Sequence, residues 1–158
     1  MKYWLYLRRS VLGNWKDADL ETKRLLLEIS GREREGWLLA EDAKSISPQA
    51  LAAIDRLWVK YSNGRFGFSV QRDIWRQLGC KSSDNMQQTI SENKFGEFVR
   101  WRVGSRWLSE WDDFNCDLQA PPGSLPRAYI FALSGWWSFS KGWTGYFILN
   151  FDRIILKL

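Results

Sequence analysis

The chain has 158 residues, of which 26% are charged, and a mean hydropathy of −0.39. This length is typical of one domain with a single core, and the composition excludes an intrinsically disordered protein. The net charge of +5 favours anionic partners without identifying one. Aromatic residues make up 16% and include eleven tryptophans, so the chain has either a heavy core or an aromatic surface for a ligand.

The first half of the chain predicts two amphipathic helices. Asn14 is a typical N-cap, and apolar residues recur at helical spacing over residues 15–29. Ser47 and Pro48 predict the start of the second helix. This helix breaks at Asn63–Gly64, a typical turn pair.

The second half predicts further helices separated by polar segments. A helix is predicted over residues 69–78, and the polar stretch 81–88 is a loop or a weak helix. Trp107 and Trp111 lie four residues apart, which indicates another helix. Residues 117–126 contain three prolines and predict an irregular loop. Since strand alternation is weak before the tail, the predicted fold class is mainly α.

Neither end of the chain has the pattern of a targeting or membrane-spanning segment. Residues 1–10 have too short an apolar stretch for a signal peptide, so they are expected to be the first element of the fold. Residues 128–149 are hydropathic, but Lys141, the glycines and the hydroxyls argue against a spanning helix. Peripheral membrane contact there stays open. Cys80 and Cys116 have no metal-binding spacing and are expected to be reduced thiols in the cytoplasm.

The residue types exclude several kinds of active site. The chain has no histidine, which excludes histidine-dependent nucleophile triads, histidine-ligated zinc and haem held by a proximal histidine. It also has no phosphate-binding loop or dinucleotide fingerprint. The acidic pairs Asp17–Asp19 and Asp112–Asp113 are expected to be solvated rather than catalytic. We therefore expect a binding module rather than an enzyme.

The stretch "LWVKYSNGRFGFSVQ", residues 57–71, interleaves four aromatic residues with Lys60 and Arg65. Such a surface could stack single-stranded bases, but the chain has no nucleic-acid-binding motif and no basic stripe. A tetrapyrrole with carboxylate arms is the second candidate. Covering one face of its ring would remove roughly 200–300 Å² of apolar area, contributing about 5–8 kcal/mol. Because association itself costs about 4–15 kcal/mol, cations must also bind the carboxylates.

Four segments carry a resemblance to a known family. "NWKDADLETKRLLL", "LWVKYSNGRFGFSVQ", "VRWRVGSRW" and "APPGSLP" occur in the order and approximate spacing of the genomes-uncoupled-four family, which the chain resembles over residues 14–126. The resemblance implies a single cupped helical domain over residues 1–158 with long mobile loops. It also implies binding of protoporphyrin IX or Mg-protoporphyrin IX, without catalysis and without a required cofactor. Magnesium in the ligand could keep water as its axial ligand.

The resemblance further implies a regulatory role in chlorophyll biosynthesis. Members of the family activate magnesium chelatase, so the large subunit of that enzyme is the implied partner, in a cytoplasm of cyanobacterial type and without nucleic acid. The alternative is a paralogous interaction or signalling module that keeps the fold and binds little porphyrin. Three features depart from the family: Ser124 stands where a histidine is expected, no separate helical domain precedes the module, and the tail 127–158 does not align with assurance.

The resemblance also implies the site. Arg65 would face a propionate, Arg127 would be another carboxylate partner, and Trp111 and Phe114 would be lid contacts. The two mobile loops would comprise residues 30–47 and 113–126. The full set of implied ligand-binding residues is Arg65, Phe66, Phe68, Gln71, Trp101, Trp111, Phe114 and Arg127.

Several of these residues also fit an ordinary structural role. Phe66 and Phe68 flank one glycine, so in an extended chain one of them points into the core. Gln71 could satisfy buried backbone groups, and Arg65 could form a surface ion pair. Trp101 fits the core as well as a cup wall. By helical periodicity, the tryptophans expected in the core are Trp15, Trp58 and Trp75.

Overall fold

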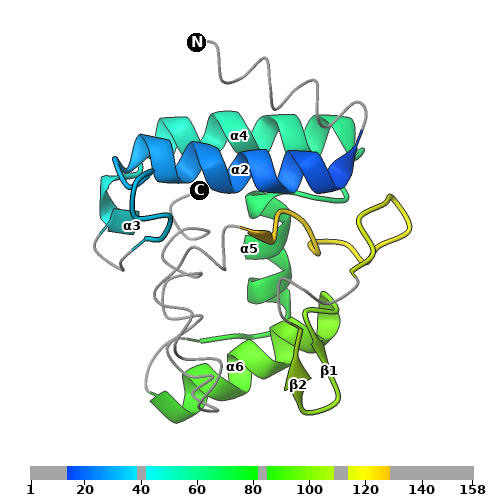
Figure 1. The fold of residues 1–158 in the computed structure, drawn as a ribbon. Helices are drawn as coiled ribbons and strands as arrows, with labels where there is room; N and C mark the ends of the chain where they lie inside the picture. The colour runs from blue at the N-terminus through cyan, green and yellow to red at the C-terminus, as the bar shows by residue number, and fades with distance from the viewer. Residues whose placement is uncertain (1–13, 39–41, 82–84, 109–113, 129–158) are drawn as a thin grey trace.

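The fold is mainly α, as predicted. The computed structural model describes residues 14–38, 42–81, 85–108 and 114–128. Their elements, in order, are α2 (Trp15–Ile29), α3 (Asp42–Ser45), α4 (Pro48–Tyr61), α5 (Phe68–Gln77), α6 (Asn85–Phe98), β1 (Arg102–Val103) and β2 (Arg106–Trp107). Figure 1 shows α2 and α4 side by side at one end, α6 with the β-hairpin at the other, and α5 between them.

The predicted starts of α2 and α4 are confirmed by their capping hydrogen bonds. Asn14 Oδ1 accepts from the backbone N–H of Lys16 at 2.9 Å, and Ser47 Oγ accepts from Ala50 N–H at 3.1 Å. Such bonds satisfy N–H groups that have no partner within the helix.

Helices α2 and α4 pack through buried aromatic residues. Trp58 is completely buried, and its indole N–H donates to Thr22 Oγ1 at 3.0 Å. The ring centroids of Trp15 and Trp58 are 5.7 Å apart, and Phe66 meets Trp15 edge-on at 5.3 Å. The expectation that Trp58 and Trp75 belong to the core is confirmed, since Trp75 is only 3% exposed, and Trp15 packs against that core while staying partly exposed.

The turn between α4 and α5 depends on a glycine. Gly67 has a φ of 140°, and a Cβ atom there would lie 2.7 Å from Asp55 Oδ1. The same oxygen accepts from Ser69 N–H at 2.9 Å, at the start of α5. Asp55 therefore caps α5 from the preceding helix, and only glycine leaves room for it.

The prediction of a helix through Trp107 is wrong. Helix α6 ends at Phe98, Arg100 leaves the helix with a φ of 62°, and Arg102 pairs with Trp107 across an antiparallel hairpin. The hairpin places the Trp107 ring against Gly96 of α6, where the side chain is 9% exposed. Burial of this ring explains why Trp107 lies in a strand. The polar residues 85–88, in contrast, are helical and belong to α6.

Some predictions lie outside the described residues. These are the first ten residues as an element of the fold, the tail beyond residue 128, and Trp111 as a lid contact. Among the described residues, no helix has both the length and the apolar character that crossing a bilayer requires. Cys80 and Cys116 are free thiols, as expected.

Candidate functional site

Residues 114–128, called here the 114–128 loop, form an irregular segment, as predicted for most of it (Figure 1). Its backbone is bonded to the turn between α4 and α5. Gly67 N–H donates to Leu125 O at 3.0 Å, and Gly123 N–H donates to Arg65 O at 2.9 Å. The aromatic stretch identified in the sequence and the proline-rich loop therefore lie together, although the bonded residues are 58 positions apart in each pair.

Four of the predicted ligand residues are buried in the core. Phe66, Phe68 and Gln71 are 0% exposed, and Trp101 is 2% exposed. The Trp101 indole N–H donates to Ser124 O at 2.8 Å. Gln71 and Trp101 thus hold the loop through hydrogen bonds, whereas the Phe66 ring packs against Trp15 and Trp58. Ligand contact by these predicted residues stays a prediction.

Arg65 also contacts the loop. Its Nε–H donates to Ala120 O at 2.8 Å, and the residue is half-buried. The structure thus assigns this guanidinium a bond to backbone rather than the surface ion pair considered from the sequence. Whether it also faces a propionate stays a prediction.

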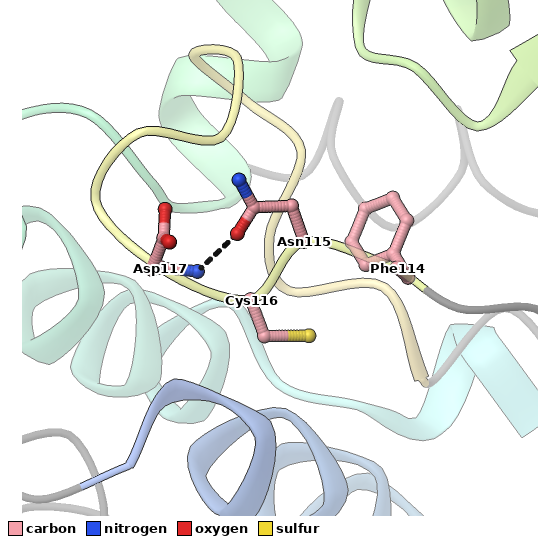
Figure 2. A pocket seen from close by; sticks show the side chains of 4 residues that line it. All are labelled: Phe114, Asn115, Cys116 and Asp117. Carbon is pink, nitrogen blue, oxygen red and sulfur yellow. Dashed lines mark hydrogen bonds between the residues drawn. The ribbon is translucent and has the colours of Figure 1, made fainter.

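An open pocket of about 520 Å³ lies at the start of the loop, lined by Phe114, Asn115, Cys116 and Asp117. Figure 2 shows the side chains of Asn115 and Cys116 leaving the chain on opposite sides. Asn115 Oδ1 accepts from Asp117 N–H at 3.1 Å, and Asp117 Oδ1 accepts from Gln119 N–H at 2.6 Å. These two successive Asx turns give the pocket wall a defined backbone shape.

Arg127 stabilises the aromatic side chain that lines the pocket. It is 5% exposed, its guanidinium carbon lies 4.5 Å from the centroid of the Phe114 ring, and its Nη2 donates to Leu108 O at 2.6 Å. A cation over an aromatic face is attracted by the ring quadrupole, so Arg127 holds the half-buried Phe114 ring in place. Its role as a carboxylate partner stays a prediction.

Asp19 of α2 anchors the end of the loop and is buried, so the expectation that it is solvated is wrong. Its Oδ1 accepts from the backbone N–H groups of Arg127 at 2.6 Å and Ala128 at 2.8 Å. Burial raises the Asp19 pKa to about 6, although these two bonds and the charges of Arg127 and Lys23 lower it in part.

The pocket thiol is electrostatically coupled to the same carboxylate. The Cys116 pKa is raised to about 11, mainly by burial and in part by the negative charge of Asp19, while Lys16 and Arg127 lower it in part. The thiol is therefore a weak nucleophile at neutral pH. In the described part of the chain, no three or more His, Cys, Asp or Glu side chains are grouped so that they could hold a metal ion.

Sequence reasoning missed Asn115, Cys116 and Asp117 as pocket residues. A signal for their backbone shape was present, because Asn115 and Asp117 lie two apart in a loop, a spacing that allows successive Asx turns. No local signal could have identified Asp19, whose partners lie 108 and 109 residues away.

Comparison with known proteins places this chain in a family. The GUN4-like family model matches residues 5–146. The chloroplastic tetrapyrrole-binding protein of Arabidopsis thaliana is 53% identical over 67 residues, covering 41% of this chain and 25% of the relative. The Ycf53-like protein of Synechocystis sp. is 31% identical over 115 residues, covering 72% and 45%. The chain thus spans between a quarter and just under half of these relatives.

Two solved structures share the fold. The ligand-free structure of Arabidopsis thaliana GUN4 matches with a TM-score of 0.67 and 28% identity, covering 94% of this chain and 91% of that one. The structure of GUN4 from Chlamydomonas reinhardtii matches with a TM-score of 0.68 and 25% identity, covering 95% and 82%. The family match over most of the sequence confirms the resemblance of the motifs: the chain belongs to the GUN4-like family.

Proposed function

We propose that this chain binds a tetrapyrrole and acts as a binding protein rather than a catalyst. The observation that carries the proposal is the family match over residues 5–146. The name of the Arabidopsis relative, a tetrapyrrole-binding protein, supports the ligand class.

The pocket at the start of the 114–128 loop is the proposed binding site. Its volume of about 520 Å³ lies within the range of roughly 300–1,000 Å³ that is typical of small-molecule sites. The Phe114 ring, fixed by Arg127, offers a flat apolar face for an aromatic macrocycle. Protoporphyrin IX and Mg-protoporphyrin IX are the proposed ligands. The chain has no histidine to bind the magnesium, so water could complete the metal's coordination.

Asn115 is the residue that we propose meets a carboxylate of the ligand. Its Oδ1 is engaged by Asp117 N–H, so its NH₂ group points away from that bond, as Figure 2 shows. An amide held in this orientation presents donors to the pocket, and carboxylates only accept hydrogen bonds.

The role of the bound ligand is a further part of the proposal. Regulation of magnesium chelatase through its large subunit, in a cytoplasm of cyanobacterial type, is proposed from the resemblance. Peripheral membrane contact is proposed from the hydropathic residues 128–149. A pull-down of the chelatase subunits with and without porphyrin would test this role. If no chelatase subunit is recovered either with or without porphyrin, the result would favour the alternative of an interaction module with other partners.

The ligand proposal is tested by titrating the protein with deuteroporphyrin, with and without magnesium, while following tryptophan fluorescence. The eleven tryptophans give a large signal. Saturable one-to-one quenching is expected. No saturation up to ~100 μM, equivalent to binding weaker than about −5.5 kcal/mol, would refute the proposal.

Two substitutions locate the ligand. Phe114→Ala removes the stacking surface, and Asn115→Asp keeps the acceptor for Asp117 N–H while replacing the donor with an oxygen. Because Asn115→Asp loses one hydrogen bond to a charged group of the ligand, its affinity for porphyrin is expected to be at least about tenfold weaker. Leu118→Ala is the matched control, because this exposed side chain is in the same loop and does not line the pocket. Equal affinities of the Asn115→Asp and control variants would contradict the role of Asn115.

A further inference from the structure

We propose that Gln71 is a positioning residue of the ligand site rather than the ligand contact that the resemblance implied: from α5, its amide sets the shape of the 114–128 loop and so controls ligand affinity. The predicted effect of Gln71 on ligand affinity rests on the proposed function. The positioning itself rests on contacts between described residues alone.

The Gln71 side chain connects two parts of the loop. It is 0% exposed, and its Nε2 donates to Gly123 O at 3.0 Å and to Pro126 O at 2.8 Å. A primary amide supplies two N–H donors from one nitrogen without carrying a charge. Neither a carboxylate nor an apolar side chain of similar size can hold both carbonyl groups.

Gln71 is the centre of a wider set of donors that face the loop. Five carbonyl groups between Ala120 and Pro126 accept hydrogen bonds from outside the loop, and buried carbonyl groups are costly to leave unpaired. The donors are Arg65 Nε to Ala120 O, Gln71 Nε2 to Gly123 O and Pro126 O, Trp101 Nε1 to Ser124 O, and Gly67 N to Leu125 O. The shape of the loop is therefore imposed by partners beneath it.

This support reaches the pocket from both ends of the loop. Pro126, held by Gln71, is followed by Arg127, whose guanidinium lies over the Phe114 ring. In the other direction, Ala120 N–H donates to Asp117 O at 3.1 Å, and Asp117 N–H donates to Asn115 Oδ1. A displacement of the carbonyl groups bound by Gln71 would move both the ring and the amide that the ligand is proposed to meet.

The test uses Gln71→Met, which keeps the length of the side chain and removes both donors. Deuteroporphyrin affinity is expected to fall by at least about tenfold, measured by porphyrin absorbance. Gln77→Met is the matched control on an exposed position of the same helix. Trp58→Phe is a second control, because it removes the buried bond to Thr22 and leaves the loop bonds intact. A variant that is merely destabilised should resemble Trp58→Phe and bind porphyrin normally.

A ligand-independent measurement separates the failure of this inference from that of the proposed function. In a Cys80→Ser background, alkylation of Cys116 reports on the loop, since that thiol is half-buried. Gln71→Met is expected to accelerate this alkylation by about tenfold or more, whereas Gln77→Met and Trp58→Phe leave it unchanged. A folded Gln71→Met protein with the alkylation rate and affinity of wild type overturns the inference. Wild-type protein that binds no porphyrin refutes the proposed function, while the labelling result still decides the role of Gln71.

If Gln71→Met does not fold, Gln71→Glu takes its place, since it has nearly the same shape. Its carboxylate would face the carbonyl oxygens of Gly123 and Pro126 and repel them, so the same faster alkylation and weaker binding are expected at pH 8. Alkylation and affinity equal to those of Gln77→Glu would overturn the inference.

Discussion

Replacing Asp19 by asparagine isolates the free energy of a buried charge that anchors the 114–128 loop. Both backbone N–H groups, of Arg127 and Ala128, donate to the same oxygen, Oδ1. An asparagine can therefore keep both bonds through its own Oδ1 while carrying no charge. Any change in stability then reports on the charge rather than on lost hydrogen bonds.

The magnitude follows from the pKa. Burial raises the Asp19 pKa from an ordinary value of 3.8 to about 6, and at about 1.4 kcal/mol per pH unit this corresponds to about 3 kcal/mol. Because the folded state holds the proton more tightly, this contribution to stability is fully present below about pH 4 and is lost as the pH rises through about 6. Asp19→Asn should therefore match wild type near pH 4 and exceed its stability by up to about 3 kcal/mol at pH 8.

The assay is urea unfolding of wild type, Asp19→Asn and Asp19→Ala at pH 4, 6 and 8, followed by circular dichroism. Asp19→Ala leaves two buried N–H groups without an acceptor, at about 1–3 kcal/mol each, and should be the least stable variant at every pH. A stability difference between wild type and Asp19→Asn that does not change with pH would refute the reasoning. An Asp19→Asn protein less stable than wild type at pH 8 would show that the attraction between Asp19 and Arg127 exceeds the cost of burial.

Two further predictions concern the hairpin and the pocket thiol. Gly96→Ala should destabilise the fold by about 1–3 kcal/mol, because the new Cβ would lie 2.6 Å from an atom of the Trp107 ring. Urea unfolding checks this, and adding Trp107→Phe should recover part of the loss; no recovery would contradict the cause. With a pKa of about 11, Cys116 should react with iodoacetamide at pH 8 roughly 10-fold more slowly than a thiol of pKa 9.0, because a thiolate fraction about 100-fold lower is partly offset by the greater nucleophilicity of the more basic thiolate. Asp19→Asn should accelerate the reaction, and an unchanged rate would exclude coupling between the two groups.

The long helices could be predicted from the sequence because their signals are local. The caps at Asn14 and Ser47 and the apolar spacing of the residues that follow placed α2 and α4 correctly. The hairpin was missed since its strands have only two residues each, too few for an alternating pattern, and since Trp107 is placed by packing on Gly96.

The site was predicted in part. The aromatic pattern of residues 57–71 indicated a ligand surface, and the family resemblance implied that the proline-rich loop belongs to the same site. The structure brings the two segments together. It could not indicate that Phe66 and Phe68 would be covered, because aromatic residues near a turn fit a core and an exposed cup equally well. The pocket residues Asn115 and Asp117 were missed for a related reason. Polar residues are common in loops, and only the surrounding structure decides which of them line a pocket.

The sequence by itself determined the mainly helical class, the helix starts and the family, because capping, periodicity and motifs act over a few residues. Only the tertiary structure decided which side chains support the loop and which line its pocket. Gln71 meets its partners 52 and 55 residues further along, and Asp19 meets its partners 108 and 109 residues away. Such contacts depend on how the helices pack and on which donors that packing buries, and no local pattern in the chain encodes their pairing.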